Sequence, residues 1–366
     1  MTKNKRKIVY IANSFVPSKT ANSIHVVKMC QAFADNGDEV FLFIPAYDEY
    51  KDYSDEYIYK YYGVKSNFKI IRFKHFHFKG GSVFDALNLV KILNKIKPDI
   101  VYGRFLLGCL MSSLIGYDTS FELHQPINKH SVLDRFAIGL LLKKVKRFFV
   151  ISEALKNIIS NEIKSKNNIE VIHDGADDLL KSFNTTIDTN EKLKIGYIGQ
   201  LYRGRGIDII INLAKLFPNL EFHIVGGYDK DVKFWQEKAT KNVIFYGFVQ
   251  PKEIIEISQK FDILLAPYQL ETNTVDYMSP LKIFEYMSFK KAIIASDLPV
   301  LREILDETNS ILVKCDDVHE WEEAIEKLQD KALRKALSAK SYTDFVNNYT
   351  WKQRAKNIIE KLKVKK

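Results

Sequence analysis

Apolar residues in this chain form two recurring patterns, short continuous runs and longer stretches with helical spacing. The segment RKIVYIANSF (6–15) predicts a buried strand, SIHVVKMCQAFADNG (23–37) predicts an amphipathic helix, and DEVFLFIP predicts a second strand. The same order returns from residue 193, as LKIGYIGQ, IDIIINLAKLFP and LEFHIVGG. Each set begins a β-α-β unit, and such strands alternating with helices are typical of parallel sheets covered on both faces.

The repeat of this unit predicts an α/β protein with two Rossmann-like domains whose parallel sheets face each other across a cleft. The polar stretch 177–192 has no sustained period and predicts the boundary, so we expect domains over 1–182 and 190–349. The last segment, 350–366, predicts a basic amphipathic helix. Further strands are expected in FKIIRF, PDIVYGR, SFELHQ, RFFVIS, VIFYGF, FDILLAPY and KAIIASD.

Charge adds a class of partner to this picture. The 366 residues carry a net charge of +10, of which +8 falls on residues 1–185. Such a balance favours an anionic partner, namely a nucleotide, a phosphate, a nucleic acid or an anionic membrane surface. No apolar run reaches the roughly 18–20 residues that span a bilayer, and the segment after the basic N-terminus is too short and polar for a signal peptide. We therefore expect a cytoplasmic protein, at most peripheral to the inner face of the membrane.

The three cysteines, Cys30, Cys109 and Cys315, are far apart and show no metal-ligand spacing. The sequence therefore predicts reduced core thiols and no metal site.

The stretch IGYIGQLYRGRGID (195–208) has the parts of an anion site. Gly199, Gly204 and Gly206 leave room for a phosphate to approach the backbone, and the following helix points its first amides at it. Arg203 and Arg205 add fixed positive charge. The glycine spacing matches neither a Walker loop nor a dinucleotide-binding fingerprint, and the alternative is a surface turn with solvated arginines.

A second candidate begins a later helix, at SPLKIFEYM. Ser279 and Pro280 read as the N-cap and first helical residue. Lys282 falls in the first turn, where a cation opposes the helix dipole unless an anion is bound. Glu285 follows on about the same face, and a carboxylate there can hold ribose hydroxyls. The alternative is a capped surface helix.

Candidates in the first half follow strands. His124 ends the strand SFELH with Glu122 two residues earlier, and Arg104 ends DIVYGR. In the turn SFVPSKTANS, Asn22 and Ser23 are small enough to leave room for a ligand against a helix N-terminus. The alternatives are a buried neutral histidine and, for Arg104, a surface ion pair.

Two basic stretches, NFKIIRFKHFHFKGG (67–81) and LLLKKVKRF (140–148), suit an anionic membrane surface. Alternatively they form a strand and a solvated helix face. Recognition of nucleic acid is not expected, since no single-strand-binding motif is present.

Taken in order, these motifs resemble the retaining glycosyltransferases of the GT-B fold, family four, over nearly the whole chain. The similarity rests on Gly199, Gln200 and Leu201 with Arg205 and Gly206, on FFVIS, VIHDGADD, FHIVGG and VIFYGFV, on SPLKIFEYM, and on YTWKQRAK.

The resemblance implies a nucleotide-sugar donor on the second domain, an acceptor on the first, and a final helix, 350–366, that packs back on the first domain. Arg205 takes the position of the lysine that holds the donor diphosphate, and Gln200 replaces a frequent arginine. Arg203 is a candidate catalytic residue and second phosphate contact that the family does not require, and it would restore the charge lost at Gln200. Glu285 matches the ribose-binding glutamate and His124 the active-site histidine. The remaining positions it implies are Gly199, Gly206, Ser279, Pro280, Leu281 and Lys282 at the donor, and Asn22, Ser23, Arg104 and Glu122 at the acceptor.

The sequence departs from that family at two places. Tyr277, beside Asp276, stands where the first of two paired glutamates contacts the donor sugar, and Ala21-Asn22 replaces a Gly-Gly pair.

The expected activity is transfer of a hexosyl group from a UDP- or GDP-sugar to a hydroxyl of a glycan or lipid-linked acceptor, with retention and without a cofactor or metal. It would serve cell-surface polysaccharide or glycolipid assembly. A nucleotide-sugar epimerase and a non-catalytic GT-B scaffold are the alternatives, and sugar, base, linkage and oligomeric state stay open.

Overall fold

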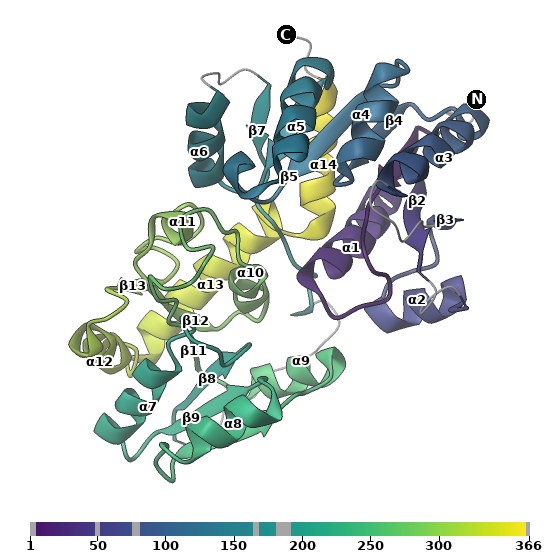
Figure 1. The fold of residues 1–366 in the computed structure, drawn as a ribbon. Helices are drawn as coiled ribbons and strands as arrows, with labels where there is room; N and C mark the ends of the chain where they lie inside the picture. The colour runs from purple at the N-terminus through teal and green to yellow at the C-terminus, as the bar shows by residue number, and fades with distance from the viewer. Residues whose placement is uncertain (1–4, 48–51, 75–80, 164–167, 181–191, 364–366) are drawn as a thin grey trace. The chain divides into compact units, whose positions relative to one another are not determined.

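The protein divides into two compact units, each built on one parallel sheet covered by helices (Figure 1). The structure is a computed structural model that describes residues 5–47, 52–74, 81–163, 168–180 and 192–363. Unit 1 comprises Met1–His173 with Trp351–Lys366, and unit 2 comprises Asp174–Thr350. The α/β class with parallel sheets is therefore confirmed. The predicted linker between 182 and 190 lies outside the described residues.

The sheet of unit 1 has the strand order β3-β2-β1-β4-β5-β6-β7, and every neighbouring pair is parallel. All residues of β4, β5 and β6 are buried, including the polar side chains of Ser120, Glu122 and Arg147. The strands are β1 (Lys7–Ile11), β2 (Glu39–Ala46), β3 (Lys69–Lys74), β4 (Ile100–Gly103), β5 (Thr119–Leu123), β6 (Arg147–Val150) and β7 (Ile169–Val171).

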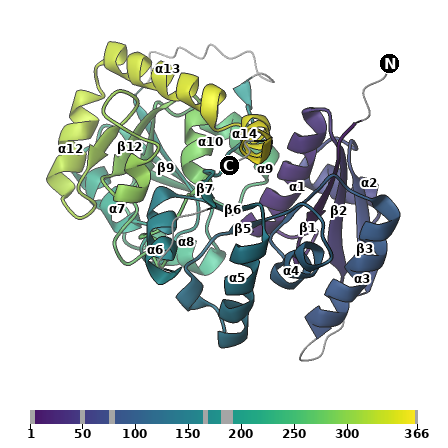
Figure 2. The same ribbon diagram turned by 90° about the horizontal axis from the view of Figure 1, so that it is seen from above.

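Helices cover both faces of this sheet because the chain first runs outward from β1 to β3 and then returns through β4 to β7. Right-handed crossovers place α1 on one face and α3, α4 and α5 on the other, where α4 packs against both neighbours (Figure 2). The final helix, α14, packs against α1. The helices are α1 (Ala21–Asp35), α2 (Asp55–Tyr62), α3 (Gly81–Ile96), α4 (Leu106–Leu114), the 3-10 helix η1 (Ile127–Lys129), α5 (Val132–Lys144), α6 (Glu153–Ile163) and α14 (Trp351–Lys363).

Unit 2 repeats this plan with the parallel strand order β10-β9-β8-β11-β12-β13. Its core includes six apolar residues of α7, and burying each isoleucine there contributes roughly 1.5–3 kcal/mol. The strands are β8 (Lys194–Ile198), β9 (Glu221–Val225), β10 (Val243–Gly247), β11 (Ile263–Ala266), β12 (Ala292–Ser296) and β13 (Ile311–Val313). The helices are α7 (Ile207–Leu216), α8 (Asp229–Gln236), α9 (Pro251–Gln259), α10 (Leu281–Ser288), α11 (Pro299–Arg302), α12 (Val318–Lys327) and α13 (Lys331–Asn348).

Most predicted elements are present within one or two residues of their expected ends. The strand β13 was not predicted, because three residues are too few to show a period. The cysteines are free and buried, as expected. Residues 75–80 of the basic-aromatic stretch lie outside the described residues. Among the described helices, none has the length and apolarity to cross a membrane.

Candidate active site

Glycine shapes the glycine loop (residues 199–206), which joins β8 to α7. Gly206 has a φ of 66°, in the left-handed region that strains other residues. A Cβ on Gly206 would lie 2.0 Å from the carbonyl oxygen of Pro267, and one on Gly199 would lie 2.6 Å from Nζ of Lys282. The backbone contact requires glycine at Gly206, and the approach of Lys282 to Gly199 brings the loop backbone against the first turn of α10.

The carbonyl oxygens of the glycine loop are held by side chains from several elements. This fixes the loop before any ligand arrives, and preorganised groups are the ones that stabilise charge most effectively. The donors are the Tyr197 hydroxyl to Gln200 (2.7 Å), the Trp235 indole to Leu201 (3.0 Å) and the Thr272 hydroxyl to Gly204 (2.8 Å).

Two cations lie at this loop, and aromatic rings hold them in place of carboxylates. Nζ of Lys282 lies 3.8 Å from the ring centroid of Tyr197, and the Arg205 guanidinium lies 4.7 Å from that of Tyr202. Tyr268 is shared, with its centroid 5.4 Å from Lys282 and 5.1 Å from Arg205. Within the described part of the chain, neither cation forms an ion pair, and Nε of Arg205 is buried without a hydrogen-bond partner. The site is therefore short of negative charge.

Electrostatics at α10 lead to the same conclusion. Burial lowers the pKa of Lys282 well below its ordinary value, the nearby Arg205 lowers it further, and Glu285 only partly opposes them. The pKa of Glu285 is raised by desolvation, against the effect of Lys282, and Asp177 raises it further. The Glu285 side chain nonetheless keeps solvent-exposed surface. It can therefore still accept hydrogen bonds from a ligand.

Both helices that begin at this site lack a side-chain cap. The N-cap of α7 is Gly206, and that of α10 is Pro280, so their first amides are open to an anion. The prediction that Ser279 caps α10 is wrong. Its buried hydroxyl accepts a hydrogen bond from the backbone amide of Asp174 at 3.0 Å, and the helix begins one residue later than expected, at Leu281.

Other predicted donor residues lie at the edge of this arrangement. Gln200 and Arg203 are exposed, and Arg203 forms no hydrogen bond or ion pair with the described residues. Tyr277 is buried, whereas its neighbour Asp276 is exposed. An exposed carboxylate thus lies beside Tyr277.

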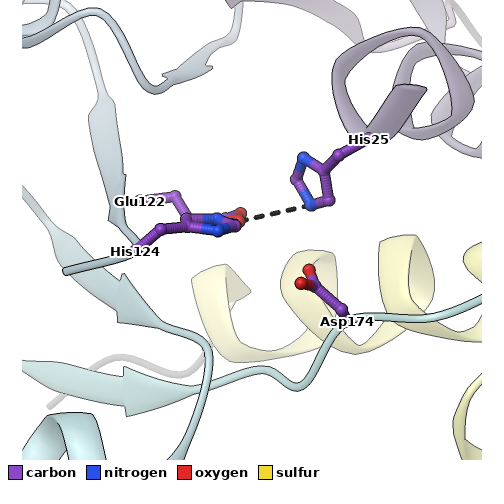
Figure 3. A group of neighbouring side chains, drawn as sticks. All are labelled: His25, Glu122, His124 and Asp174. Carbon is purple, nitrogen blue, oxygen red and sulfur yellow. Dashed lines mark hydrogen bonds and ion pairs between the residues drawn. The ribbon is translucent and has the colours of Figure 1, made fainter. Parts of the chain in front are cut away.

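Unit 1 carries a second cluster, centred on the buried carboxylate of Glu122 (Figure 3). Arg354 of α14 donates to both oxygens, at 2.9 and 3.3 Å, and the Tyr102 hydroxyl donates to Oε2. His124 hydrogen-bonds to Oε1 through Nε2, and Nε2 of His25 lies 3.3 Å from the same oxygen. Glu122 is therefore fully engaged with protein groups. It can therefore orient His124, and its place on the acceptor side stays a prediction.

Arg354 is a residue of this cluster to which the sequence analysis did not point. Its side chain is 1% exposed, and beyond Glu122 it donates from Nε to the carbonyl oxygen of His173 at 2.8 Å. A signal was present in the sequence, because Arg354 falls within the apolar stripe of the last helix. The other buried residues of that stripe are Trp351, Ala355, Ile358, Ile359 and Leu362.

Glu122 and Arg354 balance each other in this cluster. Burial alone would raise the pKa of Glu122, but Arg354, His25 and His124 outweigh it and hold that pKa well below the usual range. Burial also lowers the pKa of His25 well below its ordinary value, although Glu122 opposes this. His25 is therefore neutral at physiological pH, and the ionised pair is Glu122 with Arg354.

The donor atoms of His25, Glu122 and His124 lie within 4.8 Å of one another, close enough to raise the question of a metal ion. Their surroundings do not suit one. Arg354 occupies both oxygens of Glu122, and the guanidinium of Arg104 lies 3.4 Å from Nδ1 of His25, so two fixed cations would repel a third. Figure 3 also draws Asp174, the first residue of unit 2. The arrangement suits hydrogen bonding or proton transfer by the partly exposed His124.

The first turn of α1 carries two predicted acceptor residues, and their contacts differ. The side-chain amide of Asn22 donates to the Ser14 hydroxyl at 2.9 Å. Its side-chain oxygen, Oδ1, is buried without a hydrogen-bond partner among the described residues. Ser23 is fully buried, and its hydroxyl donates to the Ser18 carbonyl oxygen at 2.8 Å. Asn22 can therefore face a ligand, whereas Ser23 serves the turn itself. Arg104 is half-buried beside His25 and does not form the alternative surface ion pair among the contacts described.

Comparison with known proteins identifies the chain's family. Residues 23–178 match the profile described as "Glycosyltransferase Family 4", and residues 192–331 match that described as "Glycosyl transferases group 1". This chain is a family 4 glycosyltransferase. Family 4 (group 1) relatives include an uncharacterized glycosyltransferase of Methanocaldococcus jannaschii, 24% identical over 98% of this chain and 99% of its own.

A shorter match is to the alpha-galactosylglucosyldiacylglycerol synthase of Streptococcus pneumoniae, 29% identical over 33% of this glycosyltransferase and 32% of that protein. Among solved structures, HepE of Anabaena in complex with UDP-glucose superposes with a TM-score of 0.71 and 16% identity, over 97% of this chain and 99% of that one. The glycosyltransferase thus has the GT-B fold. Within that fold, the structure brings Arg205, Lys282 and Glu285 together in unit 2 and sets His124 on Glu122 in unit 1.

Proposed function

We propose that this glycosyltransferase moves a hexosyl group from a UDP- or GDP-sugar to a hydroxyl of a glycan or lipid-linked acceptor, with retention at the anomeric carbon. Arg205 and Lys282 bind the donor diphosphate, and Glu285 accepts hydrogen bonds from the ribose hydroxyls. The bond from the anomeric carbon to the diphosphate oxygen breaks, and the acceptor oxygen bonds that carbon from the same face. The departing diphosphate takes the acceptor's proton.

One observation carries this proposal: two cations beside a rigid glycine loop lie against aromatic rings and form no ion pair with a carboxylate of the described residues. A diphosphate supplies the missing negative charge, and its charge grows as the sugar leaves. Fixed donors aimed at developing charge are the usual source of such stabilisation. We therefore propose that Arg205, Lys282 and the amides of α7 and α10 act in place of a divalent metal ion, so that transfer is metal-independent.

The acceptor side follows from the cluster in unit 1. His124 is held by Glu122 and keeps partial exposure, which suits a hydrogen bond to the transferred sugar or the acceptor. The HepE structure holds UDP-glucose, which supports a nucleotide-sugar donor. The streptococcal relative is named for a diacylglycerol glycolipid, which supports a role in glycolipid or polysaccharide assembly. We place this activity at the cytoplasmic face of the membrane.

A thermal-shift screen over UDP- and GDP-sugars tests the donor first. A ligand at a hundred times its Kd stabilises the folded state by about 2.7 kcal/mol, and the Arg205→Ala variant serves as the matched control that should lose the shift. With the donor known, product NMR should show a retained anomer, and EDTA should leave the rate unchanged. Failure of every nucleotide sugar to raise the melting temperature, together with no donor hydrolysis, would favour a non-catalytic scaffold. An inverted product would exclude retention.

A further inference from the structure

Helix α5 of unit 1 is apolar on both sides, which is unusual for a helix on the surface of a globular protein. Ala137, Ile138 and Leu141 face the core. The opposite side carries large apolar side chains that are exposed to solvent. These form the α5 patch, namely Val132 (77% exposed), Leu133 (82%), Phe136 (70%) and Leu140 (38%). Contiguous exposed apolar surface of this kind marks an interaction site.

Positive charge continues the α5 patch toward the end of the helix. Lys143 and Lys144 are exposed and lie three and four residues after Leu140, so they project from about the same side. The acidic residue of this helix, Asp134, is used at its start, where the Ser131 hydroxyl donates to its carboxylate at 2.8 Å. The patch therefore combines apolar side chains with cations and has little negative charge.

A neighbouring helix widens this surface. Val83 and Leu87 of α3 are about half exposed. Both α3 and α5 cover the same face of the sheet, with α4 packed between them (Figure 2). Because α3 follows β3 and α5 follows β5, both helices begin at the carboxyl edge of the parallel sheet. His124 also follows β5, so the apolar side chains and the candidate active-site histidine share one edge of unit 1.

We propose that the α5 patch inserts into the interface of an anionic lipid bilayer, with Lys143 and Lys144 among the headgroups. The exposed apolar side of α5 ends in lysines, which suits a helix lying in the interface, and none of the described helices can cross a membrane. A second copy of the chain suits the α5 patch less. A two-fold contact would place Lys143 and Lys144 of both copies close together, and like charges repel. The inference rests on the proposed function for its purpose: a bilayer at this edge would present lipid-linked acceptors on the side of His124.

Co-sedimentation with phosphatidylglycerol-containing vesicles at low salt tests the proposal directly. The wild type should bind these vesicles, bind pure phosphatidylcholine vesicles far less, and dissociate as salt rises. The variants Leu133→Ser and Phe136→Ser should each weaken binding about tenfold or more, since each removes a large buried side chain from the bilayer. The double variant Lys143→Glu/Lys144→Glu should weaken vesicle binding by at least a similar factor.

The matched control is Leu216→Ser, which removes an exposed leucine from α7 of unit 2 and should leave vesicle binding unchanged. Wild-type protein that stays in the supernatant with anionic vesicles would overturn the inference. So would patch variants that bind like the wild type, or a wild-type dimer that Phe136→Ser converts to monomer. Vesicle binding and the donor thermal shift are separate measurements. Loss of donor shifts with intact vesicle binding would defeat only the proposed function, and the reverse would defeat only this inference.

Discussion

The two candidate clusters of this glycosyltransferase handle charge in opposite ways. In unit 1, Glu122 and Arg354 neutralise each other deep in the core and hold His124. In unit 2, Lys282 and Arg205 lie against tyrosine rings, and no ion pair with a described residue balances them. A balanced buried pair serves structure, because it is complete before any ligand arrives. An unbalanced pair serves binding, because it improves only when an anion joins it.

The largest effect should come from breaking the balanced pair. Arg354→Met should reduce the free energy of unfolding by about 3–5 kcal/mol, because it leaves the Glu122 carboxylate buried and uncompensated. Lys361→Met is the matched control on the same helix, since it removes a more exposed ion pair with Glu170 and should lower stability by only about 0–1 kcal/mol. Urea unfolding of both variants measures this. Equal losses of unfolding free energy in the two variants would show that the buried pair contributes no more than the exposed one.

Breaking the unbalanced site should leave the fold intact and affect the rate. Arg205→Ala should reduce kcat by about 10²–10³, the usual loss for one preorganised contact to developing charge. Arg203→Ala, which removes an exposed arginine of the same loop, should have a much smaller effect. Steady-state kinetics with circular dichroism distinguish the two outcomes. Full activity of Arg205→Ala would remove this residue from the diphosphate site.

We propose that His124 connects the balanced cluster to the reaction. His124→Ala should slow transfer by about 10²-fold, at the lower end of the range for a positioned acid-base or hydrogen-bonding group. Donor affinity, measured by calorimetry, should stay near the wild-type value because the donor groups lie in unit 2. An equal loss of donor affinity would assign His124 to the donor site.

A smaller effect should appear as pH dependence. The pKa of Lys282 is lowered by burial and by Arg205, so this lysine loses its proton at a lower pH than an ordinary lysine. Donor affinity should therefore decrease as pH rises through the lowered pKa, by roughly tenfold if one charge-assisted contact of 1.5 kcal/mol is lost.

The lowered pKa of Lys282 also determines how the stability of the protein changes with pH. Lys282 binds its proton more weakly in the folded than in the unfolded protein, so its contribution to stability rises with pH between the lowered pKa and the ordinary one. Lys282→Met should therefore preserve or raise the melting temperature of the ligand-free protein while abolishing the donor shift. Lys282→Arg should keep the charge and remove the pH dependence. A pH profile unchanged in Lys282→Arg would assign the titration to another group.

The sequence predicted what depends on local pattern. The two β-α-β starts, the glycine loop and the positions of His124 and Lys282 all follow from apolar periodicity and from residues placed just after strands. It could not predict partners from distant segments. Arg354 meets Glu122 across 232 residues of sequence, and Tyr268 reaches Arg205 and Lys282 only after the sheet of unit 2 has formed. Ser279 was assigned as a cap because no local pattern shows that it accepts a hydrogen bond from Asp174.

The position of α14 has a consequence for biosynthesis. Unit 1 is discontinuous: its last helix is translated only after the whole of unit 2. Until Arg354 leaves the ribosome, Glu122 lacks its guanidinium partner, and the face of α1 that α14 covers is open to solvent or to chaperones. Unit 2 has no such delay and can fold first, contrary to the usual N-terminal order. A chain truncated after Thr350 should therefore present a folded second unit beside a protease-sensitive first one, so that the unit proposed to bind the acceptor matures last.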